Sequence, residues 1–321
     1  MKNNIKDKDI LFVCFNVYNY NIEIKNKLIE LGGRVDMFEQ VKYSLLYTVL
    51  LRLRLGKKYK QYLANRIIAV ASKKKYDFVF VLEIHQTESF YKRLREVQSE
   101  ARFILYYWDS IKVFDYRPFL KYFDQAYSFD IDDVKDNKDI SYLPLFFTDT
   151  YASLREKTIN EFKYDFLQVA TFSMEKYTNM NSFIKDYSVE PSRLLVYYRT
   201  TLGKYFELLF KKFDMKWIGV KKKTQEEIVA LYAQSKCIID FDKKQQSGLS
   251  MRTIESLGAG KKLITSNSRL KNEPIYDPNN IFIIGVDDRR MLKNFIDKGF
   301  VYSEQIENYS IKNFCLRLFS E

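Results

Sequence analysis

The stretch IIDFDKKQQSGLSMRTIESLGAGKKLITSN, residues 238–267, decides the fold more than any other part of the chain. It reads as a β-rich run, a polar loop, a short helix that stops at Gly258-Ala259-Gly260, and a second β-rich run. A helix that starts at the carboxyl end of a strand presents free N–H groups and the positive end of its dipole. The stretch therefore predicts an anion site within an α/β unit.

The side chains of this stretch indicate which chemical class of anion would bind. Gly248 lets a ligand approach the backbone, and Arg252 in the first helical turn can fork onto phosphate oxygens. Glu255 follows three residues later on the same helix face, where a carboxylate suits the two hydroxyls of a ribose. Together these residues predict a cradle for a nucleoside diphosphate.

Outside this stretch, strand and helix signals alternate through two successive arrays. The first runs over residues 1–150 and the second over 151–302, followed by an amphipathic helix at 303–321 that we expect to pack back on the first array. Such alternation is typical of doubly wound parallel sheets, so we predict an α/β protein of two tandem Rossmann-like domains. Ligands of such sheets bind at the carboxyl ends of the strands. A GxGxxG motif is absent, which disfavours dinucleotide binding.

The net charge of +12 is concentrated in one segment. Residues 41–75 contain ten Lys or Arg and no acidic residue, interleaved with apolar residues. This pattern predicts contact with an anionic membrane surface, or else a core-facing helix pair with a solvated basic face. No motif supports nucleic-acid binding. With three isolated cysteines and no apolar run of membrane-spanning length, we expect a cytoplasmic protein, peripheral on the inner face of the plasma membrane.

Three pieces of the chain resemble GT-B glycosyltransferases of the bacterial capsule and lipopolysaccharide type, related to spore-coat glycosyltransferase-like proteins. They are QSGLSMRTIESLGAGKKLITSN (246–267), FILYYWDS (103–110), and KYFDQAYSFDIDD with YLPLFF (within 121–147). The resemblance implies the GT-B arrangement of two domains that face each other across a cleft. It also implies that Glu255 binds the ribose of a nucleotide-sugar donor. The donor diphosphate would be bound by Ser247, Gly248, Leu249, Ser250 and Arg252.

Glycosyl transfer requires cations for the leaving diphosphate and, for inversion, a base for the acceptor hydroxyl. Arg199 and Lys176 join Arg252 as candidate cations; either could equally be structural. Candidate bases follow apolar runs of the first domain, where each could instead be a capping or structural group. They are Glu83, the single histidine His85, and Asp109.

The sequence says less about a metal site and about whether the reaction inverts or retains the configuration of the sugar. The short acidic pairs Asp130/Asp132 and Asp240/Asp242 resemble metal-binding pairs, but such pairs are common by chance, and we expect neither a metal nor another cofactor. The Glu-X7-Glu pattern of many retaining enzymes would place its first glutamate at Ser247, so inversion and retention both stay open.

The predicted function is therefore a hexosyltransferase that moves a sugar from a nucleotide-diphosphate donor, which we expect to be a UDP-sugar. Its predicted acceptor is a growing surface polysaccharide or a lipid-linked glycan. Two other classes stay open: a non-catalytic nucleotide-sugar or glycan-binding scaffold, and a sugar-nucleotide epimerase.

Overall fold

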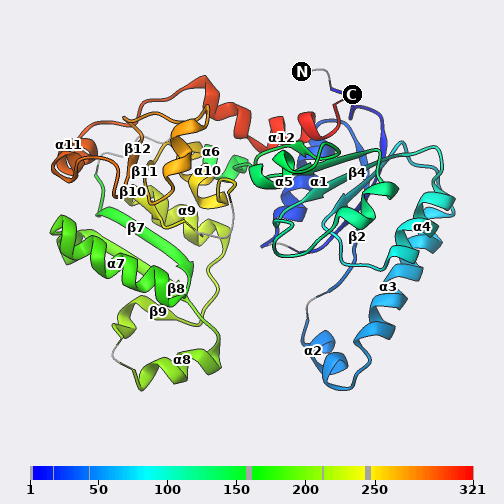
Figure 1. Cartoon of the computed structure of the whole chain (residues 1–321), viewed down its shortest axis with the longest axis horizontal. Helices are drawn as coiled ribbons and strands as arrows, with labels where there is room; N and C mark the ends of the chain where they lie inside the picture. The colour runs from blue at the N-terminus through cyan, green and yellow to red at the C-terminus, as the bar shows by residue number, and fades with distance from the viewer. Residues whose placement is uncertain are drawn as a thin grey trace. The chain divides into compact units, whose positions relative to one another are not determined.

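The computed structural model describes residues 3–16, 18–42, 44–156, 161–211, 213–242 and 247–320. The chain forms two compact units (Figure 1). The N-terminal unit comprises the chain up to Leu145, together with residues 247–249 and the segment that begins at Ile311. The C-terminal unit comprises the rest, from Phe146 to Ser310. The sequence placed the first boundary at 150, five residues later.

A six-stranded parallel sheet forms the centre of the N-terminal unit, in the order β2-β1-β3-β4-β5-β6. Its strands are β1 (Asp9–Cys14), β2 (Arg34–Glu39), β3 (Phe78–Leu82), β4 (Arg102–Tyr107), β5 (Gln125–Ser128) and β6 (Ser141–Tyr142). The helices around it are α1 (Tyr20–Glu30), α2 (Leu45–Arg52), α3 (Gly56–Ala71), α4 (Glu88–Val97), α5 (Ile131–Lys135) and α12 (Ile311–Leu318), with the 3-10 helix η1 (Arg117–Tyr122).

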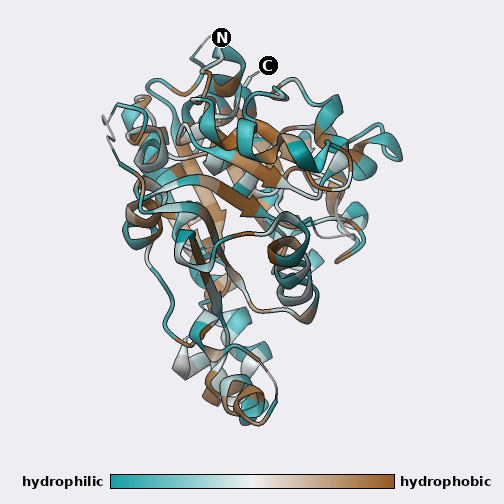
Figure 2. Ribbon diagram, turned by 90° about the vertical axis from the view of Figure 1, so that its left-hand side faces the viewer, coloured by the Kyte–Doolittle hydropathy of each residue, from teal (hydrophilic) through white to brown (hydrophobic). Residues whose placement is uncertain are grey.

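Both faces of this sheet are covered, which explains why its central strands are apolar along their whole length. One face packs on α3, α4 and η1 through residues such as Val79 and Leu105. On the other face, Phe12 and Phe80 stack at 4.7 Å, and Phe80 meets Phe319 edge-on at 5.9 Å. Helix α12 contacts α1 on this face, seen as the red and blue helices in Figure 1. Figure 2 shows the strands in brown among largely teal helices.

The C-terminal unit repeats the architecture with a second six-stranded parallel sheet, in the order β12-β11-β10-β7-β8-β9. Its strands are β7 (Tyr164–Thr171), β8 (Leu194–Arg199), β9 (Ile218–Gly219), β10 (Ser235–Asp240), β11 (Lys262–Thr265) and β12 (Ile281–Ile283). Its helices are α6 (Asp149–Ala152), α7 (Met174–Tyr187), α8 (Leu202–Leu209), α9 (Gln225–Ala233), α10 (Met251–Gly258) and α11 (Leu292–Asp297). The predicted fold class, two tandem α/β domains with parallel sheets, is confirmed.

The tail differs from the single helix expected over 303–321. The 3-10 helix η6 (Glu304–Tyr309) belongs to the C-terminal unit, and α12 to the N-terminal unit. Between them, Ser310 is extended and pairs with Phe147, whose N–H donates to the carbonyl of Tyr309 at 2.9 Å. The extended residue ends one helix and allows the next to take a new direction.

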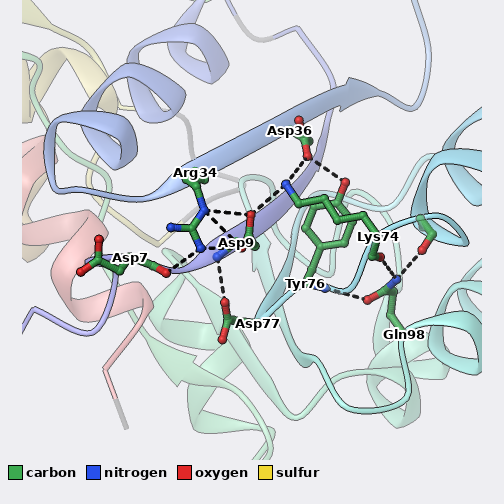
Figure 3. A network of polar contacts seen from close by, with 9 residues as sticks. Asp7, Asp9, Arg34, Asp36, Lys74, Tyr76, Asp77 and Gln98 are labelled. Atoms are coloured by element: carbon green, nitrogen blue, oxygen red, sulfur yellow. Dashed lines mark hydrogen bonds and ion pairs between the residues drawn. The ribbon is translucent and has the colours of Figure 1, made fainter.

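Ion pairs join the strands at the amino edge of the N-terminal sheet (Figure 3). Asp9 of β1 lies 2.5 Å from Arg34 Nη2 and 2.8 Å from Lys74 Nζ. Lys74 also contacts Asp36 of β2 at 2.9 Å, and the Tyr76 hydroxyl donates to the same carboxylate at 2.9 Å. The hydrogen bonds from Arg34 and then Lys74 lower the pKa of Asp9 to about 2.

Candidate functional site

Glu83 is the first residue after β3, at the carboxyl edge of the N-terminal sheet. Its backbone has φ = 63°, a conformation that non-glycine residues seldom adopt, and the residue is only 4% exposed. The backbone N–H of Trp108 donates to its Oε1 at 3.0 Å. Burial, and after it the charge of Asp109, raise the pKa of Glu83 to about 8. Glu83 therefore gains and loses its proton near neutral pH.

His85 lies beside this carboxyl group. Its Nε2 is 3.7 Å from Glu83 Oε2, and its ring packs against Phe15 with centroids 4.4 Å apart. Burial and the charge of Lys60 lower the pKa of His85 to about 4. At neutral pH both groups are thus largely uncharged, and the contact is not an ion pair. A neutral imidazole of such low basicity is a weak proton acceptor.

Gln40 holds the two residues in place and was not singled out from the sequence. It directly follows β2 and is fully buried. Its Nε2 donates to the carbonyl of Glu83 at 2.9 Å, and its Oε1 accepts from the N–H of His85 at 3.2 Å and from the Tyr91 hydroxyl at 2.5 Å. These bonds fix the unusual backbone of Glu83. Strand β2, RVDMFE, carries three charged residues, so no apolar run points to the glutamine that follows it.

Asp109 completes this cluster after β4. Asp109 is half-buried, and its charge contributes to the raised pKa of Glu83. The preceding Trp108 packs against Tyr20 of α1 at 5.7 Å and against Tyr106 at 6.1 Å. The three predicted base candidates therefore do gather at one sheet edge, and Asp109 is more accessible than Glu83.

Ser247 and Gly248 belong to the N-terminal unit. The Ser247 hydroxyl donates to Asp130 Oδ1, and its N–H donates to Asp130 Oδ2 at 3.1 Å. Ser247 Oγ accepts from the N–H of Asp132 at 3.0 Å. A Cβ on Gly248 would collide with the carbonyl and ring of Phe129. Packing against β5 and α5 thus already accounts for a serine and a glycine here.

Ser250, Arg252 and Glu255 belong to the C-terminal unit, and the first two contact Asp240 at the end of β10. Arg252 Nη1 lies 3.0 Å from Asp240 Oδ1, and the hydroxyl of Thr253 donates to Oδ2 at 3.1 Å. The hydroxyl of Ser250 also donates to Asp240, while it accepts from the N–H of Thr253 as the N-cap of α10. A quarter of the Arg252 side chain stays exposed. Leu249, which belongs to the N-terminal unit, is buried.

Glu255 lies one turn further along α10 and is only 5% exposed. Its charge, after burial, contributes to the raised pKa of Tyr232 on α9. Glu255 is therefore buried and lies near Tyr232 of α9.

Arg199 and Lys176 lie at the same carboxyl edge of this sheet. Arg199 ends β8 opposite Thr171 of β7, and Lys176 lies in the first turn of α7. Among the described residues, the buried Arg199 Nε has no hydrogen-bond partner. The N–H of Lys176 donates to the cap residue Ser173 at 3.2 Å. This edge combines two cations with the N-terminus of a 14-residue helix, an arrangement suited to anions.

A metal centre is not seen in the part of the chain that the structure describes, where no group of three or more His, Cys, Asp or Glu is placed to hold an ion. Of the acidic pairs, Asp130 caps α5 and holds Ser247, and Asp240 binds Arg252.

No family model matches the chain, and no curated protein matches it in sequence. Solved structures do match. An alpha-glucosyltransferase in complex with UDP and a 13-mer DNA containing an A:G mismatch superposes with a TM-score of 0.59 at 11% identity, covering 97% of this chain and 95% of that one.

Two other glycosyltransferases match over a similar extent. For the lipopolysaccharide outer core galactosyltransferase WaaB, the TM-score is 0.57 at 12% identity, over 97% of this chain and 98% of that one. For AviGT4, a glycosyltransferase involved in avilamycin A biosynthesis, the TM-score is 0.57 at 10% identity. The match covers 97% of this chain and 95% of that one. The chain therefore has the GT-B glycosyltransferase fold. Identities this low show the fold alone.

Proposed function

We propose that this protein is a glycosyltransferase that moves a sugar from a nucleoside-diphosphate donor to an acceptor hydroxyl. The observation that carries the proposal is the acid–base cluster of Glu83, His85 and Asp109 at a ligand-binding edge of a GT-B fold. Perturbed carboxyl groups collect at functional sites, because a catalytic base needs a pKa near the working pH.

In this proposal Asp109 accepts the proton of the acceptor hydroxyl. It is the more accessible carboxyl of the pair, whereas Glu83 is buried. Glu83 acts through Asp109: the charges of the two carboxyl groups interact, so the protonation state of Glu83 changes the charge that surrounds Asp109. His85 stays neutral and positions Glu83.

The C-terminal unit binds the donor through its basic edge. Arg199 has unused hydrogen-bonding capacity, and the N-terminus of α7 adds its dipole, so both can stabilise the leaving diphosphate without a metal ion. Arg252, Ser250 and Glu255 adjoin this edge. The similar alpha-glucosyltransferase structure contains UDP, which favours a UDP-sugar as the donor.

The acceptor in this proposal is a surface polysaccharide or a lipid-linked glycan, brought to the enzyme at an anionic membrane. Val49, Leu51 and Leu53 of α2 and the turn after it are half or more exposed. They alternate with exposed basic residues, among them Arg52 and Arg54. Apolar side chains between cations suit an anionic lipid surface. Within the described residues, no helix is long and apolar enough to cross a membrane.

Donor turnover tests the proposal. We expect the protein to release UDP from a UDP-sugar, and Arg199→Met to lower kcat/KM by roughly 10²–10³-fold. Arg193→Met is the matched control, because Arg193 lies near the opposite end of the same strand and pairs with Asp165 at 2.9 Å. Donor binding without turnover on a broad acceptor panel would favour the scaffold alternative. NMR analysis of the sugar product separates transfer from epimerisation.

Vesicle flotation tests the membrane contact. We expect binding to vesicles that contain phosphatidylglycerol, weaker binding to phosphatidylcholine alone, and loss of binding in Leu51→Ser/Leu53→Ser. Phe206→Ser/Phe210→Ser is the control, since these aromatic residues at α8 are also exposed. If the α8 variant loses binding and the α2 variant keeps it, the assignment of the surface is wrong.

A further inference from the structure

A cavity of about 590 Å³ lies in the C-terminal unit beside the end of α10. Helix α10 starts next to Asp240 at the carboxyl edge of the sheet and ends where β11 begins, so the cavity lies toward the opposite, amino edge. Its lining includes Arg155, Phe162, Lys261, Phe300, Tyr302 and Glu307. Nothing in the proposed transfer reaction uses this cavity.

Lys261 is a largely buried lysine that lines this cavity. The residue is only 4% exposed, and its Nζ lies 4.5 Å from the ring centroid of Phe162. Among the described residues it has no hydrogen bond or ion pair from Nζ. Burial lowers the pKa of Lys261 to about 8. The ammonium is not among the fully enclosed atoms without a partner, so it still meets solvent in the cavity, and its cation–π contact replaces only part of the hydration that burial of the side chain removes.

The adjacent residue, Lys262, is a buried lysine whose ammonium group does have hydrogen-bond acceptors. Lys262 is 3% exposed, and its Nζ donates to the carbonyls of Asn279 at 2.6 Å and Phe295 at 2.7 Å. The two neighbouring lysines are thus similarly buried, but among the described residues only Lys262 has protein acceptors for its Nζ. The difference indicates that the acceptor for Lys261 comes from outside the protein.

The other charged groups of the cavity leave room for an anion. Glu307 is engaged by Arg155 Nη1 at 2.6 Å and by the Tyr302 hydroxyl at 2.9 Å. The guanidinium of Arg155 lies over the Tyr302 ring at 5.1 Å. Glu156, the other acidic residue of the lining, is exposed. Negative charge inside the cavity is therefore already compensated.

We propose that this cavity is a second ligand site, which binds a small organic anion whose oxyanion group accepts from Lys261 and whose ring lies against Phe300 and Tyr302. The cavity volume is in the range of small-molecule sites, and apolar walls with a few placed polar groups are usual for them. The oxyanion is a carboxylate or a phosphate, and the two are separated by the probes below.

Competitive acetylation with mass-spectrometric readout tests this site in the whole chain, with phenyl phosphate, benzoate and inorganic phosphate as probes. An anion at Lys261 raises the pKa of the ammonium, and each unit of increase lowers the reactive neutral fraction about tenfold. We expect saturable protection of Lys261 by phenyl phosphate or by benzoate, with little change at Lys262. Protection by inorganic phosphate to the same extent would show that the ring does not contribute and overturn that part of the proposal.

Binding and stability measurements on Lys261 and Lys262 variants provide a second test that does not depend on acetylation. Calorimetric binding of the protecting probe should be lost in Lys261→Met, retained in part in Lys261→Arg, and unaffected by Arg199→Met at the donor edge. Without ligand, Lys261→Met should raise Tm by a few degrees, because it removes an uncompensated charge, whereas Lys262→Met should lower Tm, because it leaves two carbonyls without a donor. Binding that persists in Lys261→Met, or no saturable binding by any probe, overturns the proposal.

Discussion

The two edges of the N-terminal sheet carry charged groups in opposite arrangements. At the amino edge, Asp9 and Asp36 share Lys74, so each carboxylate has a cation nearby, and both side chains are partly exposed. At the carboxyl edge, buried Glu83 has another acid, Asp109, and a neutral imidazole as neighbours. The first arrangement stabilises the ionised form of Asp9, whereas the second destabilises the ionised form of Glu83. An edge that keeps carboxyl groups in such surroundings is suited to proton transfer rather than to stability.

The largest expected effect is on catalysis at the carboxyl edge. We expect Asp109→Asn to lower kcat by roughly 10²–10⁴-fold, because an amide cannot accept the hydroxyl proton. Donor affinity, measured by calorimetry, should stay unchanged, since the donor-binding residues lie in the C-terminal unit. An Asp109→Asn protein with unimpaired turnover would exclude this residue as the base.

The next effect concerns the pH dependence of stability. The pKa of Glu83 is about 8 in the folded protein and near 4.5 when it is exposed, so the folded state holds the extra proton between these values. The free energy of unfolding should therefore fall as the pH rises from about 4.5 to 8, on the order of a few kcal/mol in total.

Glu83→Gln should remove this fall, and it should also remove an apparent pKa near 8 from the pH profile of kcat/KM. Urea unfolding and initial rates measured across this pH range check both parts. Identical pH profiles for the variant and the parent protein would contradict the assignment.

A smaller effect of opposite sign is expected at the amino edge. The pKa of Asp9 is lowered from 3.8 to about 2, so its contribution is present above pH 3.8 and is lost as the pH falls toward 2. Since solvent screens this site, Asp9→Asn should cost only about 1 kcal/mol at neutral pH. Turnover should not change. A loss of activity at unchanged stability would mean that the amino edge is also functional.

The smallest expected effect is at the rim of the same network. Lys8 contacts Asp77 at 2.9 Å, and both side chains are exposed by a third or more. Lys8→Ala should change the free energy of unfolding by about 0–0.5 kcal/mol. Chemical denaturation resolves this from the Asp9→Asn value. Equal destabilisation of Lys8→Ala and Asp9→Asn would contradict the expectation that the exposed Lys8–Asp77 pair contributes less to stability than Asp9 does.

The sequence predicts which residues lie at the sheet edges better than it predicts which residues they form hydrogen bonds with. Apolar runs followed at once by a polar residue located Glu83 and Asp109 at strand ends, because parallel strands bring their carboxyl ends to one edge. The bond between Ser247 and Asp130 joins residues 117 positions apart, and no local pattern encodes it. The different surroundings of Lys261 and Lys262 are likewise invisible in the sequence, since the acceptors come from distant carbonyls.

Helix α12 has a consequence for how the chain is made. Phe319 packs on Phe78 and Phe80 of β3, and the Arg102 guanidinium donates to the carbonyl of Ser320 at 3.0 Å. The ribosome must therefore synthesise the whole C-terminal unit before the N-terminal sheet receives its last covering helix. At about 5–20 residues per second, the stretch from Leu145 to Ile311 takes roughly 8–33 s. During that time the Phe78 and Phe80 rings lack the Phe319 ring that packs on them in the complete protein.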